Sequence, residues 1–166
     1  MSSLHESTII RAIAQEEAAH IYHNIRDISD LPLENETSAR LTSGDAVLLT
    51  AGAVGFILIN FKPRYTPFAR LKIPEIQGLS VHKDVRGQGI AKALVMAAEN
   101  HVLEKGLAVV GLGVGLSSFY GPAQCLYVSM GYKPDGNGIV YDGNPIAQGT
   151  SVLNDDDLCL MMIKEL

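Results

Sequence analysis

The sequence has few cysteines, few charged residues and no long apolar run, and each shortage excludes a class of protein. Its two cysteines, Cys125 and Cys159, are too few for a disulfide framework, so nothing indicates an oxidising compartment. No apolar run reaches the length of a membrane span, and residues 1–6 lack the basic start and apolar stretch of a signal peptide. We therefore expect a cytoplasmic protein with no membrane partner.

Positive charge is also scarce. The chain has 13 Lys and Arg against 18 Asp and Glu, which gives a net charge of −5. This balance argues against a nucleic-acid partner and fits a substrate that is cationic before it reacts. The 166 residues are 47% hydrophobic and only 19% charged, enough apolar material for one compact core. The sequence thus predicts a single domain, residues 7–166.

One glycine-containing turn organises the chain. A predicted strand ends in Leu79-Ser-Val81, and the turn Arg86-Gly-Gln-Gly-Ile-Ala91 opens a helix that Gly106 closes. Glycine lets the backbone approach a ligand closely, and the unpaired N–H groups and positive dipole end of a new helix attract anions. The turn therefore predicts a cradle for a pyrophosphate. Its spacing matches neither a Walker-A loop nor a dinucleotide fingerprint.

Hydrophobic patterning predicts strands and helices on both sides of this turn. Period-two and β-branched runs indicate strands, and apolar residues at helical spacing indicate helices. Residues 62–74, which contain three prolines, predict a long surface loop. Strands are expected at 7–12, 46–50, 53–61, 75–81, 107–116 and 158–163, a small hairpin around 139–141, and helices at 15–25, from 90 to Gly106 and at 122–130.

Two further patterns were weighed as ligand sites. His20 and His23 share the helix over 15–25, but no carboxylate stands at a telling spacing, so no metal site is predicted. Gly111, Gly113 and Gly115 leave one face of the strand over 107–116 without side chains, which indicates a bulge, tight packing or close approach of a ligand. A dinucleotide fold is excluded because no helix starts directly after the third glycine.

A second motif, Ala123-Gln-Cys-Leu-Tyr-Val-Ser-Met-Gly-Tyr132, begins 32 residues after the turn ends at Ala91. It resembles the signature Ala-x-x-Leu-Tyr-x-x-x-Gly-Phe/Tyr of the GNAT (Gcn5-related N-acetyltransferase) superfamily. The turn itself resembles that superfamily's acetyl-CoA loop, Arg/Gln-x-x-Gly-x-Gly/Ala, and the two motifs stand in the family's order. The resemblance covers nearly the whole chain. Within the superfamily the sequence is similar to an uncharacterised bacterial subgroup, which does not name a substrate.

The resemblance implies an α/β (α+β) fold with a mixed, mostly antiparallel twisted sheet, helices on both faces and a splayed central strand pair. It implies acetyl-CoA as the acetyl donor, no metal, and an amine of a small molecule or peptide as the acceptor. The strand end pairs with the pantetheine arm, and the turn holds the pyrophosphate. The implied cofactor-binding residues are Leu79, Ser80, Val81, Arg86, Gly87, Gln88, Gly89, Ile90 and Ala91.

The resemblance also implies two catalytic residues. Glu75 takes the place of the base that removes the amine proton, directly or through water; a strand-end glutamate that reaches solvent is the alternative. Tyr127 takes the place of the acid that protonates the CoA thiolate, with core packing as its alternative. A phenol with a pKa near 10 keeps its proton at neutral pH. Many members carry Asn where this chain has Tyr120, so that pantetheine contact is not carried over, and Cys125 is turned off the Tyr127 face.

These features predict an acetyl-CoA-dependent N-acetyltransferase that works by direct attack in a ternary complex. The alternatives are a non-catalytic acyl-CoA-binding or sensing domain and an interaction domain that binds no CoA. In the family, residues equivalent to 26–45 build one wall of the acceptor pocket, to which Tyr65 and Phe68 either contribute or serve only to pin their loop to the core. The run Asp155–Asp157 predicts a solvated acidic segment. The sequence does not distinguish a monomer from a homodimer.

Overall fold

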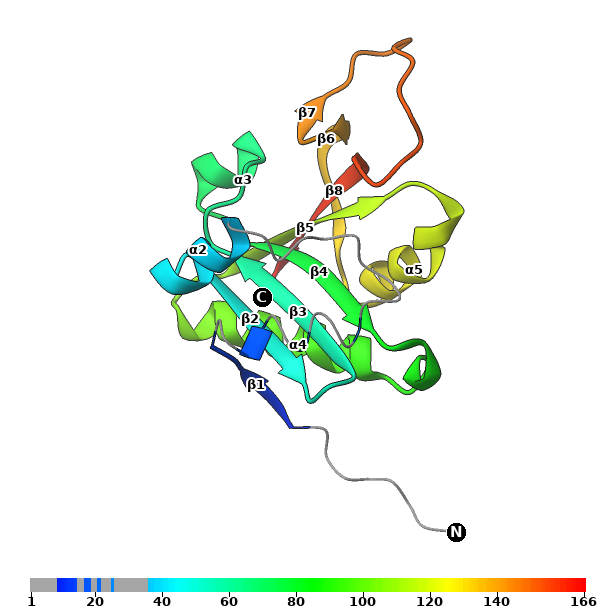
Figure 1. The fold of residues 1–166 in the computed structure, drawn as a ribbon. Helices are drawn as coiled ribbons and strands as arrows, with labels where there is room; N and C mark the ends of the chain where they lie inside the picture. The colour runs from blue at the N-terminus through cyan, green and yellow to red at the C-terminus, as the bar shows by residue number, and fades with distance from the viewer. Residues whose placement is uncertain (1–8, 15–16, 19–20, 22–24, 26–35) are drawn as a thin grey trace. The chain divides into compact units, whose positions relative to one another are not determined.

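The computed structural model describes residues 9–14, 17–18, 21, 25 and 36–166 (Figure 1). Most of the helix predicted over 15–25, with His20 and His23, lies outside the described residues. No described helix is long and apolar enough to cross a membrane. The described elements are β1 (Ile10–Ala12), α2 (Glu36–Ser43), β2 (Ala46–Ala51), β3 (Gly55–Asn60), α3 (Thr66–Leu71), β4 (Glu75–Val81), η1 (Lys83–Val85), α4 (Ile90–Glu104), β5 (Val109–Gly115), η2 (Ser118–Tyr120), α5 (Gly121–Ser129), β6 (Lys133–Tyr141), β7 (Asn144–Pro145) and β8 (Leu158–Glu165).

The described strands form an eight-stranded sheet in the order β1-β2-β3-β4-β5-β8-β6-β7. The pairs β1–β2, β2–β3, β5–β8, β6–β8 and β6–β7 are antiparallel, whereas β4 and β5 are parallel. The predicted mixed, mostly antiparallel α/β fold is therefore confirmed, while the splay of its central pair stays a prediction. Contacts divide the chain into two compact units, residues 1–60 with 77–101 and residues 61–76 with 102–166.

The first unit is built on the β2–β3 hairpin, which the sequence predicts. Every residue of β3 is buried. On one face, Phe56 and Leu58 pack in a cluster with Ile13 and Leu41, the latter from α2. On the other face, Gly55 lies so close to α4 that an added Cβ would be 3.1 Å from the Leu94 Cδ1 atom. Helices therefore cover both faces of this half of the sheet, because each strand is apolar on both sides.

The second unit is built on β8, which pairs with both β5 and β6. The register runs from Val109↔Glu165 to Gly115↔Cys159 along β5. Strand β6 contains the predicted hairpin strand but is longer, and a register shift lies between its Pro134 and Ile139 pairs. The hairpin closes at Tyr141↔Asn144.

The prediction of a surface loop over 62–74 is wrong at the centre of that segment, where α3 forms. Prolines do not prevent this helix because Pro67 stands in its first turn, where no intrahelical N–H bond is needed. Lys72, with φ 55°, ends the helix in the left-handed region. Tyr65 and Phe68 are 3% and 1% exposed and their rings meet edge to face at 4.9 Å. Of the two roles weighed for these aromatics, the structure favours pinning to the core.

The glycines of β5 are covered by side chains from other elements. A Cβ at Gly111 would lie 2.3 Å from the Phe68 ring, and one at Gly115 would lie 2.2 Å from the Tyr120 ring. At Gly113 the nearest atom is the Met161 Sδ at 3.1 Å. Real Cβ atoms do not approach carbon atoms at the distances found at Gly111 and Gly115, and the contact at Gly113 is tight, so close packing explains this face of the strand.

Candidate functional site

In the first unit, β4 carries the residues expected to meet the pantetheine arm. Gly78 has φ 59°, a left-handed conformation that a regular strand does not use. Strict alternation along β4 would place Glu75, Gln77, Leu79 and Val81 on one face, but the left-handed residue in the middle of the strand interrupts that alternation. A glycine inside a strand is the sequence signal that could have predicted this bulge.

The predicted phosphate turn has the backbone that an anion cradle needs. Gly87 and Gly89 have φ 76° and 83°, and no atom lies within 4 Å of the position of a Cβ at either residue. Conformation rather than crowding thus requires glycine here, and the space beside the backbone is open. Arg86 is tied in place because its Nε donates a hydrogen bond of 3.1 Å to the Val81 carbonyl.

The helix behind this turn offers its free N–H groups. Helix α4 has 15 residues and begins at Ile90. Its first intrahelical bond runs from the Ala93 N–H to the Gly89 carbonyl, so the N–H groups of the residues before Ala93 are not used by the helix. Together with the helix dipole, these groups fit the diphosphate of a nucleotide-like ligand.

In the second unit, Tyr127 lies on α5 and is 7% exposed. Burial raises the pKa of its phenol to about 12. Its ring meets the edge of the Tyr132 ring at 5.7 Å. No residue that the structure describes makes a hydrogen bond to the Tyr127 hydroxyl. The phenol is therefore protonated at neutral pH and its proton is not engaged within the described part of the chain.

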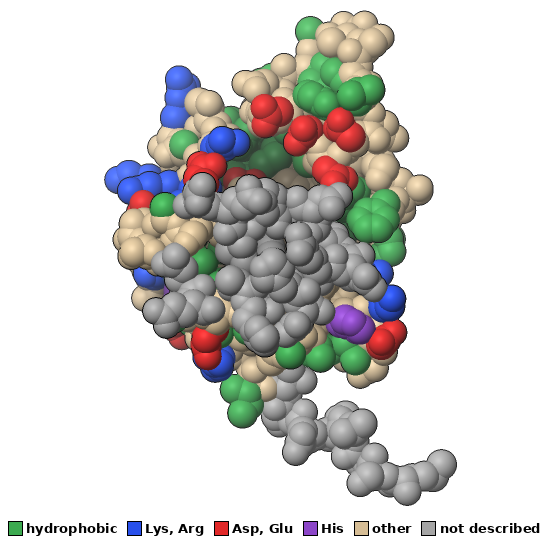
Figure 2. All heavy atoms as spheres, viewed as in Figure 1, with side chains coloured by type: hydrophobic (Ala, Val, Ile, Leu, Met, Phe, Trp, Pro, Cys, Tyr) green, Lys and Arg blue, Asp and Glu red, His purple; other side chains and the backbone are tan. Residues whose placement is uncertain are grey.

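Three other tyrosines differ from Tyr127 because each donates its hydroxyl proton to an aspartate. Tyr65 bonds Asp135 at 2.7 Å. The remaining two bonds, Tyr120 to Asp156 at 2.6 Å and Tyr141 to Asp155 at 2.8 Å, reach the acidic run before β8. The acidic run is exposed as predicted at Asp156 and Asp157, whereas Asp155 is half-buried, and two of its carboxylates also accept these tyrosine bonds. Figure 2 shows acidic side chains gathered in the region of β6, β7 and β8.

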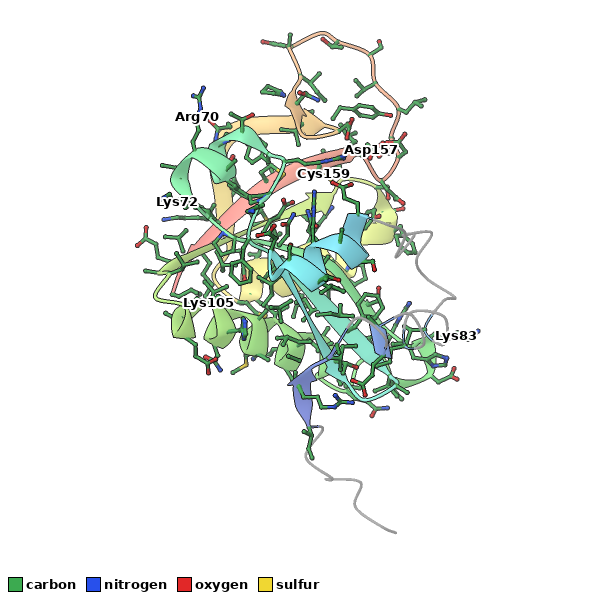
Figure 3. All side chains as sticks on the ribbon, turned by 60° about the vertical axis from the view of Figure 1, so that its left-hand side comes forward. Arg70, Lys72, Lys83, Lys105, Asp157 and Cys159 are labelled. Atoms are coloured by element: carbon green, nitrogen blue, oxygen red, sulfur yellow. The ribbon has the colours of Figure 1, made fainter. Side chains whose placement is uncertain are left out.

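Glu75 lies at the start of β4, where it is half-buried and stands opposite Gly111 of β5. The Glu75 carboxylate acts electrostatically on the thiol of Cys159, which lies at the start of β8 beside Asp157 (Figure 3). Burial, the Glu75 carboxylate and the three aspartates of the acidic run raise the pKa of the Cys159 thiol to about 11. The sequence gives no sign of this neighbourhood, because β4 and β8 are far apart along the chain.

This thiol should be slow to react with an alkylating reagent. A pKa of about 11 in place of the ordinary value of 9.0 leaves about 100-fold less thiolate at neutral pH. We expect iodoacetamide to modify the exposed Cys125 well before Cys159, as measured for each site by mass spectrometry. Replacing Glu75 with Gln removes a nearby negative charge and should speed alkylation of Cys159. Equal rates at the two cysteines in the wild-type protein would contradict the raised pKa.

No group of three or more His, Cys, Asp or Glu side chains suited to a metal ion occurs among residues 36–166 and the described positions before them.

Comparisons with known proteins agree with this geometry. A family model described as "Acetyltransferase (GNAT) domain" matches residues 44–134. No curated protein sequence matches the chain. Three solved structures are similar to 95% of this chain: an IAA acetyltransferase from Bacillus cereus (TM-score 0.62, 19% identity, 99% of that chain), the ribosomal-protein-S18-alanine N-acetyltransferase from Escherichia coli (0.63, 18%, 92%), and Arabidopsis thaliana Naa50 in complex with the bisubstrate analogue CoA-Ac-MVNAL (0.66, 12%, 98%). At these identities the similarity concerns the fold alone.

Proposed function

Since the chain belongs to the GNAT acetyltransferase family, we propose that it is an N-acetyltransferase that moves an acetyl group from acetyl-CoA to a primary amine of a small molecule or peptide. The observation that carries this proposal is Tyr127, a buried phenol that is protonated and not hydrogen-bonded by any described residue. A domain that only bound CoA would not need such a proton donor. The open turn before α4 supports the choice of donor.

Two segments of the first unit would bind the donor. Acetyl-CoA supplies an acetyl group activated as a thioester. The backbone N–H groups of Gly87–Ala91 bind the pyrophosphate, helped by the dipole of α4, while the Arg86 N–H donates to the Lys83 carbonyl at 3.4 Å. The backbone of Leu79–Val81, which follows the bulge at Gly78, pairs with the pantetheine arm, and an N–H group there polarises the thioester carbonyl.

Two residues of the second unit would move the protons. Glu75, or a water molecule that it orients, takes a proton from the acceptor ammonium, so the amine can attack the thioester carbonyl directly. As the carbon–nitrogen bond forms and the carbon–sulfur bond breaks, the Tyr127 hydroxyl gives its proton to the sulfur. The second proton that the nitrogen loses on becoming an amide returns to the Tyr127 oxygen, directly or through water, and Glu75 releases its proton to solvent. The net products are the amide, free CoA thiol and one proton. With a pKa of about 12 this phenol holds its proton at neutral pH, so the proton is present when the thiolate forms.

The test of the proposal is release of CoA thiol from acetyl-CoA across a panel of amines. The panel should contain a peptide with a free N-terminus, a polyamine, an aminoglycoside and an amino acid. The peptide is included because the names of two similar structures mention a ribosomal protein and the bisubstrate analogue CoA-Ac-MVNAL. Turnover with one class would establish the activity. Acetyl-CoA binding in a calorimeter without turnover on any amine would favour the sensing domain, and no binding would refute the assignment of the turn.

Replacing Glu75 with Gln should lower kcat/KM by roughly 100-fold, because general-base catalysis contributes about that much or more. Glu165→Gln is a matched control on an exposed glutamate at the end of β8, paired only weakly with Lys133 at 3.9 Å, and should retain activity. A Glu75→Gln variant with kcat/KM within about threefold of the wild type would assign the base to another group.

We further propose that the acetyltransferase domain spans residues 7–166 and acts in the cytoplasm. Light scattering after size-exclusion chromatography would distinguish a monomer from a homodimer.

A further inference from the structure

Tyr120 joins three parts of the second unit: the end of β5, the start of α5 and the segment before β8. It is the N-cap residue of α5, the helix that carries Tyr127. Its ring covers the bare end of β5, where a Cβ at Gly115 would lie 2.2 Å away. Its hydroxyl donates a 2.6 Å hydrogen bond to the Asp156 carboxylate, just before β8. Hydrogen bonds to an ionised acceptor are shorter and stronger than neutral ones, so this bond can hold the start of α5 in place.

A second contact holds the same helix turn to the same glycine. The Gln124 Nε2 donates a 2.7 Å hydrogen bond to the Gly115 carbonyl. The start of α5 is thus fixed to the end of β5 by a ring and an amide, and to the segment before β8 by the Tyr120 hydroxyl. Of these contacts, only the last depends on a single oxygen atom that can be removed without changing the packing.

These contacts at the start of α5 affect where Tyr127 lies. The two tyrosines are seven residues apart, about two helical turns, and therefore lie on nearly the same side of α5. A short helix moves as a rigid body, so a change at its N-cap is carried to the Tyr127 hydroxyl. Proton transfer requires that the donor lie within hydrogen-bond reach of the sulfur, and a shift of about 1 Å can cost up to 100-fold in rate.

We propose that Tyr120 is a positioning residue for Tyr127, and that its hydrogen bond to Asp156 sets the place of the Tyr127 hydroxyl. This inference rests on the proposed function, in which Tyr127 donates the proton. It assigns to Asp156 a role in the acetyl transfer although that carboxylate is exposed and stands in the acidic run.

A double-mutant cycle separates positioning from simple stabilisation. Tyr120→Phe should lower kcat by about 10-fold and leave KM for acetyl-CoA within twofold, because the ring and its packing remain. In the Tyr127→Phe background, Tyr120→Phe should have little further effect, since the residue through which it acts is gone. Asp156→Ala should reproduce the effect of Tyr120→Phe. If the two tyrosine substitutions multiply independently, the positioning role is refuted.

Tyr141→Phe is the matched control, because it removes the same kind of bond from the neighbouring Asp155 without touching α5. It should leave kcat within twofold. A readout without turnover is the Cζ resonance of Tyr127 in protein labelled with 13C-tyrosine, assigned from the Tyr127→Phe spectrum. This resonance should shift in Tyr120→Phe and not in Tyr141→Phe. If no amine is acetylated, the proposed function fails, but the spectrum still tests the positioning of Tyr127 by Tyr120. A Tyr127 resonance that does not move in Tyr120→Phe overturns the inference.

Discussion

Replacing Tyr127 with phenylalanine is expected to lower kcat by at least about 100-fold, the usual contribution of a general acid. The substitution removes one oxygen atom and keeps a ring that is 7% exposed and packed against Tyr132. Binding of acetyl-CoA, measured by calorimetry, should therefore change by less than about threefold. Steady-state release of CoA thiol gives kcat with whichever amine the panel identifies.

The control for this experiment is Tyr132→Phe, which changes the neighbouring ring in the same way and should keep kcat within about twofold. A Tyr127→Phe variant as active as the wild type would remove the phenol from the mechanism and leave water as the acid. A variant that no longer bound acetyl-CoA would assign Tyr127 to binding instead of proton transfer.

The pH dependence of the wild-type enzyme provides a separate test of the same residue. Burial raises the Tyr127 pKa to about 12, so the phenol loses its proton only as the pH approaches that value. Between about pH 6 and 10 the proton donor is present throughout, and deprotonation of Tyr127 should produce no fall in kcat. A fall with a midpoint near pH 9 that vanished in Tyr127→Phe would contradict the raised pKa.

Replacing Phe68 with alanine is expected to have the largest effect on stability, about 3–5 kcal/mol in the free energy of unfolding. The side chain is 1% exposed, meets Tyr65 edge to face and occupies the space above Gly111. Removing it opens a cavity that Gly111 cannot fill, because glycine has no side chain. Urea unfolding followed by circular dichroism measures the loss.

The matched control is Phe119→Ala, at a ring that is 66% exposed, where the change should stay within about 0.5 kcal/mol. If Phe68→Ala does not fold, Phe68→Leu keeps most of the volume and should lose less stability than the alanine variant. A loss below about 1 kcal/mol in Phe68→Ala would mean that this ring is not a main support of the second unit.

Much of the fold could be predicted because its signals are local. The β2–β3 hairpin, the glycine turn before α4 and the helix that Gly131 ends each follow from patterns within about fifteen residues. The residues of the phosphate turn were also identifiable, since glycine, backbone N–H groups and a helix start lie next to one another. The α3 helix was missed because proline marks a loop and a helix start equally well.

The contacts around the candidate site could not be predicted in the same way. The Tyr65–Asp135 and Tyr120–Asp156 bonds join residues 70 and 36 positions apart, and no local pattern specifies such partners. The same holds for the pairing of Glu75 with Gly111 and the charge effect of Glu75 on Cys159. The sequence could suggest which residues act; only the folded chain identifies what surrounds them.

The glycines of β5 have a consequence for how this sequence can change over generations. The Phe68 ring occupies the volume that a side chain at position 111 would need, and the Tyr120 ring does the same at position 115. A mutation that adds a methyl group at 111 becomes tolerable only after position 68 has lost carbon atoms. We therefore expect homologous sequences to covary at positions 68 and 111, and at 120 and 115, with a small residue in one place wherever the other holds a ring.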